Sequence, residues 1–343
     1  MSREIHDVFV TRTIPLDGIR VLEDECDYRI WSGPEDGSPD QATILEEVRN
    51  CRVLLSLLTE KIDRPILEAN ESLLGVANYA VGFDNIEIET ATSLGIPVTN
   101  TPGILTETTA DLAWVLLMAV ARRIPEAHNY TMAGKYNIWS PSLLLGEDIG
   151  PGPRNEPKTL GIVGYGRIGR GVHRRATGFS MRVLAYDPWA KDTVLQSEGV
   201  EYADFPHLLE QSDFVTLHCN LTQETHHLIG RKELERMKNT AYLVNTSRGP
   251  VIDEKALVWA LKNNKIAGAG LDVYEEEPKL AEGLAELRNV VLLPHVASAS
   301  RATRGEMAIV AARNALALLR KERAPNTVNP DVYDTEAFRK RIG

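Results

Sequence analysis

The sequence lacks long apolar runs and has no apolar segment at its beginning. Its longest uninterrupted apolar stretch, Leu112 to Ala121, has ten residues, whereas a helix needs ~20 to cross a bilayer. Residues Met1 to Asp7 do not contain the apolar core of a signal peptide. We therefore predict no membrane span and no secretory signal, and we expect a cytoplasmic protein.

Cysteine is scarce and basic residues are not in excess. The three cysteines, Cys26, Cys51 and Cys219, are odd in number and widely spaced, which suits neither a disulfide framework nor a zinc site. We predict no metal site. The formal net charge of −10 argues against nucleic acid or an anionic membrane as a partner. It leaves the substrate open, because a basic pocket can lie inside an acidic protein.

What the chain does contain is a repeated alternation of strand-like and helix-like segments. Its 343 residues are enough for two domains, each with its own core. In the first third, strands are expected near Val8 to Val10, Val53 to Leu58 and Ser72 to Ala77, with helices over Leu16 to Glu25 and Gln41 to Asn50. This order predicts a small parallel α/β domain.

A glycine-rich turn follows an apolar strand at Leu160 to Val163. Gly164, Gly166 and Gly169 have the G-x-G-x-x-G spacing. In such a turn the first glycine permits a sharp bend, the second admits a pyrophosphate and the third lets the next helix pack on the strand. Alone the motif is weak, since plain loops and methyltransferases have similar turns.

The context of the turn favours a dinucleotide. A second strand, Arg182 to Tyr186, ends at Asp187, eighteen residues after Gly169, where an acidic residue accepts hydrogen bonds from the adenosine ribose. The alternative is a solvated aspartate in an Asp-Pro turn. Further apolar strands near residues 214–218, 241–245, 267–273 and 290–293 predict about six parallel strands, the size of a dinucleotide-binding sheet.

Three polar residues follow the last three of these strands. Arg248, Glu277 and His295 suit the reduction of a 2-oxo acid. An arginine offers a planar fork to a carboxylate and a keto oxygen, a protonated histidine supplies the proton, and a glutamate stabilises the imidazolium. Each could instead be an ordinary surface or core residue, but their joint placement on one sheet makes coincidence improbable.

Other segments have a functional and a plain interpretation. Asn78 to Gly82 follows a strand, and its backbone N–H groups could bind a carboxylate or form a simple turn. The apolar helix Leu112 to Arg122, with Trp114, Leu117 and Met118, fits an interface between domains or subunits, or core burial. We expect a loop over Trp139 to Pro157, a final amphipathic helix over Arg301 to Arg320, and a loosely held end from Tyr333 to Gly343.

The motifs together resemble the D-isomer-specific 2-hydroxyacid dehydrogenase family, most closely its glyoxylate/hydroxypyruvate reductases. They run in family order from about residue 8 to about residue 330. The segments that carry the resemblance are Val76 to Ile86, Val98 to Glu107, Thr108 to Asp111, Leu160 to Gly169, Asn245 to Gly249, Leu271 to Val273, Glu277-Pro278 and Pro294-His295.

The resemblance implies an α/β protein of two Rossmann-like parallel-sheet domains, one flavodoxin-like and one dinucleotide-binding, with a cleft between them. The substrate domain would comprise residues 1–106 and 300–335, and the NAD-binding domain residues 107–299. Arg248, Glu277 and His295 would form the catalytic set. Family members are usually homodimers built through the equivalents of the helix over 112–122 and the loop after it.

The expected ligand contacts follow from the same motifs. For the cofactor they are Thr109, Gly164, Tyr165, Gly166, Arg167, Ile168, Gly169, Asp187, Pro188, His218, Cys219, Thr225, Thr246, Ser247 and Asp272. For the substrate they are Leu58, Asn78, Tyr79, Ala80, Val81 and Gly82, together with Arg248 and His295.

We expect NAD(H) in preference to NADP(H). Asp187 would repel a 2′-phosphate, the following Pro188-Trp-Ala has no arginine to bind one, and Lys191 is the nearest cation. The rival activities are 3-phosphoglycerate dehydrogenase, D-lactate dehydrogenase and an NAD-sensing corepressor-like binding protein. The chain departs from the family in extra residues between Ile149 and Lys158, and in Asn220 where a proline is common.

Overall fold

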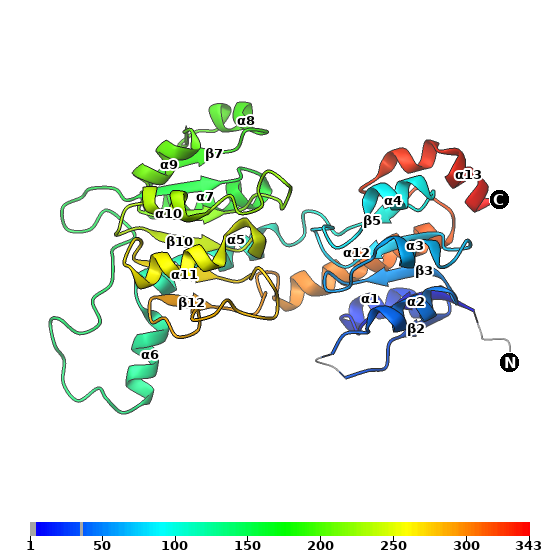
Figure 1. Ribbon diagram of the computed structural model, residues 1–343, viewed down its shortest axis with the longest axis horizontal. Helices are drawn as coiled ribbons and strands as arrows, with labels where there is room; N and C mark the ends of the chain where they lie inside the picture. The colour runs from blue at the N-terminus through cyan, green and yellow to red at the C-terminus, as the bar shows by residue number, and fades with distance from the viewer. Residues whose placement is uncertain (1–4, 35–36) are drawn as a thin grey trace. The chain divides into compact units, whose positions relative to one another are not determined.

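The computed structural model describes residues 5–34 and 37–343, which divide into two compact units. One unit comprises Met1–Leu105 and Ala299–Gly343, and the other comprises Thr106–Ser298. Each contains one parallel β-sheet with helices against it (Figure 1). The prediction of two parallel-sheet α/β domains is confirmed.

The first unit has a five-stranded sheet in the order β2-β1-β3-β4-β5. Its strands are β1 (His6–Val10), β2 (Tyr28–Ile30), β3 (Cys51–Ser56), β4 (Gly75–Asn78) and β5 (Val98–Thr99). The fourth strand begins and ends later than Ser72 to Ala77, because residues 70–73 form a turn. Alternate residues of β1 enter opposite cores: Val8 and Val10 pack on one face and Phe9 on the other, as a strand buried on both faces requires.

Helices cover both faces of this sheet. One core includes residues of α1 (Leu16–Glu23) and α12 (Arg301–Leu319), and the other includes residues of α2 (Gln41–Val48), α3 (Arg64–Glu68) and α4 (Ile88–Ser93). At Gly18 of α1 an added Cβ would lie 2.6 Å from the Ala308 carbonyl oxygen of α12, so this glycine permits the close approach of the two helices. The expectation that α12 is the final helix is wrong, because another follows it.

The second unit has a seven-stranded sheet in the order β12-β11-β10-β9-β6-β7-β8. Its strands are β6 (Thr159–Val163), β7 (Arg182–Tyr186), β8 (Glu201–Tyr202), β9 (Phe214–Leu217), β10 (Tyr242–Asn245), β11 (Gly268–Leu271) and β12 (Val290–Leu292). The expected number of about six omitted β8, which pairs only two residues with β7 at the edge. The strand order reverses between β6 and β9, where dinucleotides bind in sheets of this kind.

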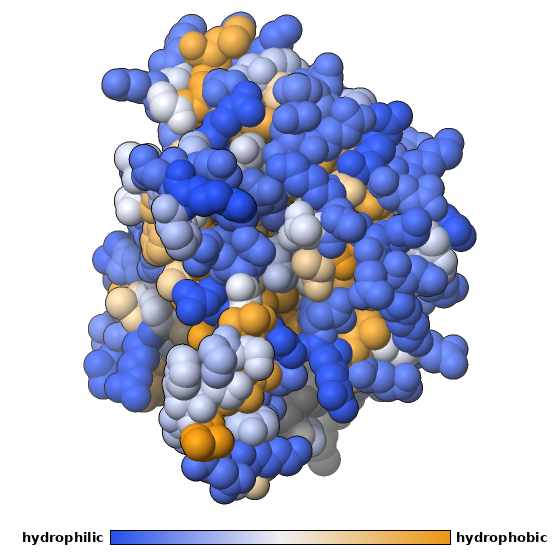
Figure 2. All heavy atoms as spheres, turned by 90° about the vertical axis from the view of Figure 1, so that its left-hand side faces the viewer, coloured by the Kyte–Doolittle hydropathy of each residue, from blue (hydrophilic) through white to orange (hydrophobic). Residues whose placement is uncertain are grey.

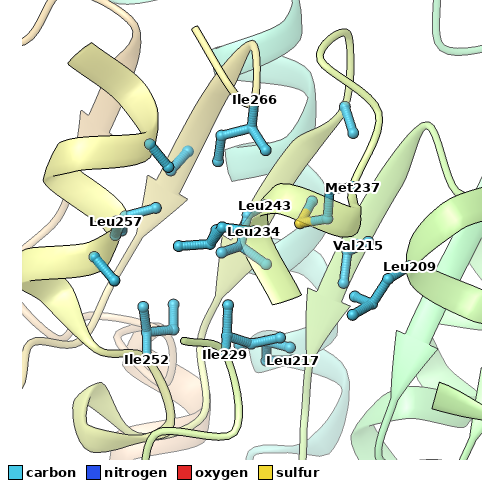
Figure 3. Packing of buried hydrophobic residues seen from close by; sticks show 14 of the residues in the cluster. Leu209, Val215, Leu217, Ile229, Leu234, Met237, Leu243, Ile252, Leu257 and Ile266 are labelled. Atoms are coloured by element: carbon cyan, nitrogen blue, oxygen red, sulfur yellow. The ribbon is translucent and has the colours of Figure 1, made fainter. Parts of the chain in front are cut away.

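Two cores sandwich this sheet. One includes residues of α5 (Thr106–Ala121) and α7 (Arg167–Gly178), with Val194 of α8 (Lys191–Gln196). The other packs β9 to β11 against α9 (Phe205–Gln211), α10 (Arg231–Arg236) and α11 (Glu254–Lys262). Figure 3 shows side chains of this second core, where Leu217, Leu234, Leu243 and Leu257 gather between strands and helices.

The helix α5 starts earlier than expected, since Thr106 to Thr109 form its first turn instead of only preceding it. Trp114 and Leu117 are buried in the core of the second unit, whereas Val115 and Met118 are exposed. Core burial therefore explains the apolar side chains of Trp114 and Leu117, but not those of Val115 and Met118. The helix α6 (Ile124–Met132) comes next, and residues 139–157 form neither helix nor strand, as expected. Over the described residues, no helix is both long and apolar enough to span a bilayer.

The prediction of a loosely held carboxyl end is wrong. Residues from Pro330 onward form a 3₁₀ turn (Pro330–Asp334) and the helix α13 (Glu336–Ile342). Tyr333 and Phe338 meet edge to face with ring centroids 5.0 Å apart and are buried together with Val332. The many charges of this segment masked an apolar face that packs on its own unit.

A guanidinium group fastens α13 to the first unit. Arg341 donates hydrogen bonds to the carbonyl oxygens of Leu94, Glu71 and Leu73, each at 2.9 Å. Burial lowers the pKa of Arg341, and the charge of Glu71 acts in the opposite direction. One side chain thus satisfies several backbone acceptors that would otherwise lose their partner.

We expect Arg341→Ala to lower the free energy of unfolding by roughly 1–3 kcal/mol, because three backbone acceptors, two of them in partly buried hydrogen bonds, lose a charged donor. Urea titration followed by circular dichroism measures this change. The matched control is Lys340→Ala, whose side chain is exposed on the same turn of α13. Equal losses in the two variants would show that the contacts of Arg341 do not stabilise the fold.

Candidate active site

The glycine turn after β6 has the geometry of a phosphate-binding loop. Gly164 has a φ of +90°, and a Cβ there would lie 2.5 Å from the backbone nitrogen of Cys219. A Cβ on Gly169 would lie 2.2 Å from the Gly164 carbonyl oxygen, whereas at Gly166 nothing lies within 4 Å. The outer glycines are therefore required by packing, and the middle one leaves open space for a ligand. The helix α7 starts at Arg167 and directs its N-terminus at this turn.

Asp187 connects the glycine turn to the loop after β7. One carboxylate oxygen accepts from the Tyr165 N–H at 2.8 Å, and the other accepts from the N–H groups of Trp189 at 3.0 Å and Ala190 at 3.1 Å. An ionised carboxylate has about four acceptor positions. The three backbone bonds place the group firmly and leave capacity for a ribose hydroxyl.

Two buried polar atoms near this edge have no partner among the residues that the structure describes. They are His218 Nδ1, just after β9, and Thr246 Oγ1, just after β10. Buried polar groups are normally hydrogen-bonded, so two orphans at adjacent strand ends suit contacts with a ligand. Burial lowers the pKa of His218 to about 3, so its ring is neutral.

Other residues that we expected at the cofactor have polar groups engaged within the chain. The Tyr165 hydroxyl lies 2.6 Å from His173 Nδ1, and the Thr225 hydroxyl donates to the Asn220 carbonyl oxygen at 2.6 Å. The Ser247 hydroxyl donates to Asn245 Oδ1 at 2.8 Å. Burial raises the pKa of Cys219 to about 11, so that thiol is protonated. Thr109 is buried in the first turns of α5. These side chains shape the loops around the turn.

The three residues expected to be catalytic follow three neighbouring strands. Arg248 follows β10, Glu277 lies beyond β11 and His295 beyond β12, and these strands are adjacent in the sheet. His295 Nδ1 lies 2.9 Å from Glu277 Oε2. An ionised carboxylate only accepts, so Nδ1 carries the proton of this bond. Nε2 is then the nitrogen left to exchange a proton with a substrate.

The electrostatics of Glu277 keep it ionised. Burial acts to raise the pKa of Glu277, but the hydrogen bond and charge of His295, the N–H of Tyr274 and the charge of Arg248 outweigh burial and lower it. The N–H of Tyr274 donates to Glu277 Oε1 at 3.0 Å. Both carboxylate oxygens are therefore held, one by the backbone and one by the imidazole.

The loop that carries Arg248 is held by its own hydrogen bonds and packs closely on the segment that leads to Glu277. Asn245 Nδ2 donates to the Arg248 carbonyl oxygen at 2.9 Å, and Arg248 Nη1 donates to that of Ser247 at 2.8 Å. A Cβ added at Gly249 would lie 1.8 Å from the Tyr274 carbonyl carbon, so only glycine fits there. The backbone of Gly249 therefore packs directly on that of Tyr274.

His295 is fixed through Asp272. The His295 N–H donates to the Asp272 carbonyl oxygen at 2.8 Å, and the Asp272 carboxylate accepts from Val296 N at 2.8 Å and Ala297 N at 2.7 Å. His295 itself has a φ of +53°, a conformation that is uncommon outside glycine and is found at functional sites. Asp272, which we expected to contact the cofactor, thus holds the backbone on both sides of the histidine.

Sequence reasoning missed Tyr274. Its hydroxyl donates to the Leu293 carbonyl oxygen at 2.8 Å, two residues before His295, while its N–H binds Glu277. Burial is the main cause that raises the pKa of Tyr274 to about 12. The signal available in the sequence was its position in Asp272-Val-Tyr-Glu, between the strand and the glutamate.

In the first unit, the segment Asn78–Gly82 at the end of β4 presents backbone donors. The carbonyl oxygens of residues 80–82 are already paired. That of Gly82 accepts from the Asn78 side chain at 2.8 Å, and that of Val81 accepts from the Asn100 side chain at 2.8 Å. The Ala80 carbonyl oxygen accepts from the Thr101 N–H at 2.9 Å. The Tyr79 N–H donates to the Ser56 carbonyl oxygen, and the Tyr79 hydroxyl donates to the Arg304 carbonyl oxygen. Within residues 5–34 and 37–343, the N–H groups of residues 80–82 have no acceptor. Leu58, also expected at the substrate, is 38% exposed.

The site of the second unit defines a class of protein: an oxidoreductase that binds a nicotinamide dinucleotide. The open space at Gly166, the orphaned atoms of His218 and Thr246, and the carboxylate of Asp187 fit that cofactor. A paired histidine and glutamate with an arginine fit acid–base chemistry at a keto or hydroxyl group. In the described residues, no group of three or more His, Cys, Asp or Glu side chains is arranged to hold a metal ion.

Comparison with known proteins identifies the family. Residues 114–297 match the model of the D-isomer specific 2-hydroxyacid dehydrogenase NAD-binding domain. The chain is 51% identical over 327 residues to a glyoxylate reductase of Korarchaeum cryptofilum (strain OPF8), covering 95% of this chain and 96% of that protein. The chain therefore belongs to the D-isomer specific 2-hydroxyacid dehydrogenase family.

Solved structures agree with this assignment. The TT0316 protein from Thermus thermophilus is 40% identical, with a TM-score of 0.85 over 94% of this chain and 99% of that one. An NADPH-dependent glyoxylate/hydroxypyruvate reductase from Sinorhizobium meliloti, solved with NADP and malonate, is 31% identical. Its TM-score is 0.81 over 96% of this chain and 98% of that one.

Proposed function

We propose that this enzyme reduces glyoxylate or hydroxypyruvate to the D-2-hydroxy acid, with NADH as the preferred cofactor. The observation that carries the proposal is the pairing of His295 with Glu277 at 2.9 Å, on strand ends adjacent to that of Arg248. The names of the Korarchaeum and Sinorhizobium relatives support glyoxylate and hydroxypyruvate as the substrates.

Each residue has a distinct part in the proposed reaction. A reduced nicotinamide held at the glycine turn would supply the hydride. Arg248 binds and polarises the keto group, because its guanidinium is a fixed fork of donors. His295 gives its Nε2 proton to the oxygen that becomes the hydroxyl, and Glu277 stabilises the protonated ring. The N–H groups of residues 80–82 bind the substrate carboxylate, since consecutive backbone donors form an anion site.

The cofactor would be held by the turn at Gly164 to Gly169, by His218 and Thr246, and by Asp187. We propose that Asp187 sets the preference for NAD(H). Its carboxylate is fixed by three backbone N–H groups, so it cannot turn away from a 2′-phosphate. The Sinorhizobium structure contains NADP, which makes the choice between the two cofactors a property of this loop to be measured.

We expect Asp187→Asn to lower the ratio of kcat/KM for NADH to that for NADPH by at least about tenfold. Two like charges at ~4 Å repel by roughly 1–4 kcal/mol, and asparagine removes the charge while its side-chain oxygen can still accept from Trp189 N. Steady-state kinetics with both cofactors measures the ratio. Asp192→Asn, an exposed acid on α8, controls for the general loss of negative charge and should leave the ratio unchanged.

We also propose a homodimer that forms through α5, α6 and the segment after them. The helix α6 has no buried residue, and Ile138 is 80% and Trp139 72% exposed. Figure 2 shows hydrophobic side chains at the surface in its lower part, at the height of α6 in Figure 1. Apolar surface gathered in this way is typical of an interface. Sedimentation equilibrium of the purified protein distinguishes a dimer from a monomer. The cytoplasmic location stays a prediction.

The substrate is tested by following NADH absorbance with glyoxylate, hydroxypyruvate, pyruvate and phosphohydroxypyruvate. The proposal expects the highest kcat/KM with one of the first two. Preference for pyruvate would indicate a D-lactate dehydrogenase, and preference for phosphohydroxypyruvate a 3-phosphoglycerate dehydrogenase. NADH binding without oxidation by any 2-oxo acid would support a binding protein of the same fold.

A further inference from the structure

A buried carboxylate that the proposed reaction does not use lies at the first turn of α11. Glu254 is only 4% exposed. Burial is the main cause that raises its pKa, two backbone hydrogen bonds act to lower it, and the charges of Glu275 and Glu277 raise it again. In the described part of the chain no lysine or arginine pairs with it. A buried acid without a counter-charge costs free energy, so its presence calls for a function.

Glu254 forms hydrogen bonds to the backbone on both sides of Glu277. Its Oε1 accepts from the Glu275 N–H at 2.9 Å, and its Oε2 accepts from the Ala281 N–H at 3.2 Å. These two donors lie on either side of Glu277 along the chain. One carboxylate therefore holds both ends of the segment 275–281.

Glu275, at the start of the same segment, binds back to the first turn of α11. Its Oε2 accepts from the Glu254 N–H at 3.2 Å, and its Oε1 lies 2.7 Å from His227 Nε2. The two glutamates thus bind each other's backbone. The start of α11, which is anchored in the core by Leu257, becomes the support of the segment.

We propose that Glu254 is a positioning residue that holds the Glu277 carboxylate against His295. The inference rests on the proposed function, in which Glu277 stabilises the protonated histidine. Glu277 is bound by Tyr274 N and His295 Nδ1, and Tyr274 adjoins the end of the segment that Glu254 fixes. Release of that segment lets Glu277 leave the imidazole without disturbing the glycine turn.

Glutamine is the most informative replacement. It has nearly the same volume as glutamate, but its side chain has only one acceptor oxygen, and its NH₂ group would face the second backbone donor. Glu254→Gln therefore breaks one of the two anchors and leaves the core filled. Glu276→Gln is the matched control, since Glu276 is exposed in the same segment.

In steady-state reduction of glyoxylate, we expect Glu254→Gln to lower kcat by roughly 10- to 100-fold, the usual effect of a small misplacement of a catalytic group. The Kd for NADH, measured by fluorescence titration, should stay within about twofold, because no contact of the glycine turn changes. Glu276→Gln should resemble the wild type in both. An unchanged kcat in Glu254→Gln would overturn the proposal.

A double-mutant cycle separates positioning from general destabilisation. If Glu254 acts through Glu277, then Glu254→Gln combined with Glu277→Gln should be no slower than Glu277→Gln alone by more than about twofold. Losses that multiply would show an independent structural effect and refute the positioning role. If Glu254→Gln fails to fold, the same cycle is run with Glu254→Asp, which keeps both acceptor oxygens.

A spectroscopic readout does not depend on turnover. The imidazole nitrogen signals of His295 in ¹⁵N NMR should shift in Glu254→Gln and stay unchanged in Glu276→Gln. No shift in either variant would overturn the positioning role even in an enzyme with the proposed activity. Conversely, if the wild-type protein failed to oxidise NADH with every 2-oxo acid tested, the proposed function would be contradicted. The NMR shift of His295 would still report whether Glu254 positions Glu277.

Discussion

Replacement of His295 by alanine is expected to lower kcat for 2-oxo acid reduction by at least ~100-fold, the usual contribution of a positioned acid–base group. The imidazole is the group that Glu277 orients, at 2.9 Å through Nδ1, and alanine leaves no proton donor there. The Kd for NADH should change little, because the glycine turn follows a different strand of the sheet. Stopped-flow measurement of NADH oxidation at saturating substrate gives the rate of the chemical step.

The control for this experiment is His207→Asn, an exposed histidine on α9 of the same unit. It should keep the wild-type rate. Should His295→Ala retain full activity, the histidine would not be the proton donor and the proposed mechanism would fail.

The direction of the reaction should depend on pH in a defined sense. The pKa of Glu277 is lowered in the folded protein. Its carboxylate therefore keeps its negative charge as pH falls, and loses that charge only below the pH at which an ordinary glutamate is protonated. Protonated His295 is the acid in reduction and neutral His295 the base in oxidation. Reduction should therefore be favoured at lower pH and oxidation at higher pH.

The second large effect is expected at Arg248. Arg248→Lys should lower kcat/KM for the 2-oxo acid by roughly 30- to 1,000-fold, since it replaces a two-pronged, charge-assisted contact worth ~2–4 kcal/mol by a single point charge. We expect KM to rise and kcat to fall, because in the proposed reaction Arg248 both binds and polarises the keto group. Initial rates over a range of glyoxylate concentrations separate the two parameters.

Arg288→Lys, at an exposed position of the same unit, controls for the change of side chain. Lysine keeps the positive charge at position 248, so this position should still help to lower the pKa of Glu277, and the variant tests the guanidinium geometry. Wild-type kinetics in Arg248→Lys would mean that the guanidinium fork is not needed to bind or polarise the substrate.

Much of the fold was accessible from the sequence because parallel sheets have a strong pattern. Runs such as Leu160 to Val163 are continuously apolar, as strands covered on both faces must be, and the glycine spacing marked the first turn of the dinucleotide sheet. The strand β8 escaped notice because two residues carry no periodicity. The end of the chain was misjudged because the charges around Phe338 outnumber the apolar residues that anchor it.

The residue types of the candidate site were also accessible, but their connections were not. Arg248, Glu277 and His295 each follow a strand, and the rule that parallel strands end at one edge brings them into the same region. Three contacts could not be predicted because they join segments about 20 residues apart. Asp272 binds the backbone after His295, Tyr274 binds the strand end before His295, and Glu254 binds the segment that carries Glu277.

The amino-acid order alone was enough to specify two α/β sheets, a dinucleotide turn and the chemistry of an arginine, a glutamate and a histidine, since strand burial and glycine spacing are local properties. Only the folded chain decided which polar atoms are already satisfied and which remain for a ligand. Hydrogen-bond partners are set by distance in space, and a carboxylate such as Asp272 or Glu254 reads the same in the sequence whether it binds a ligand or its own backbone.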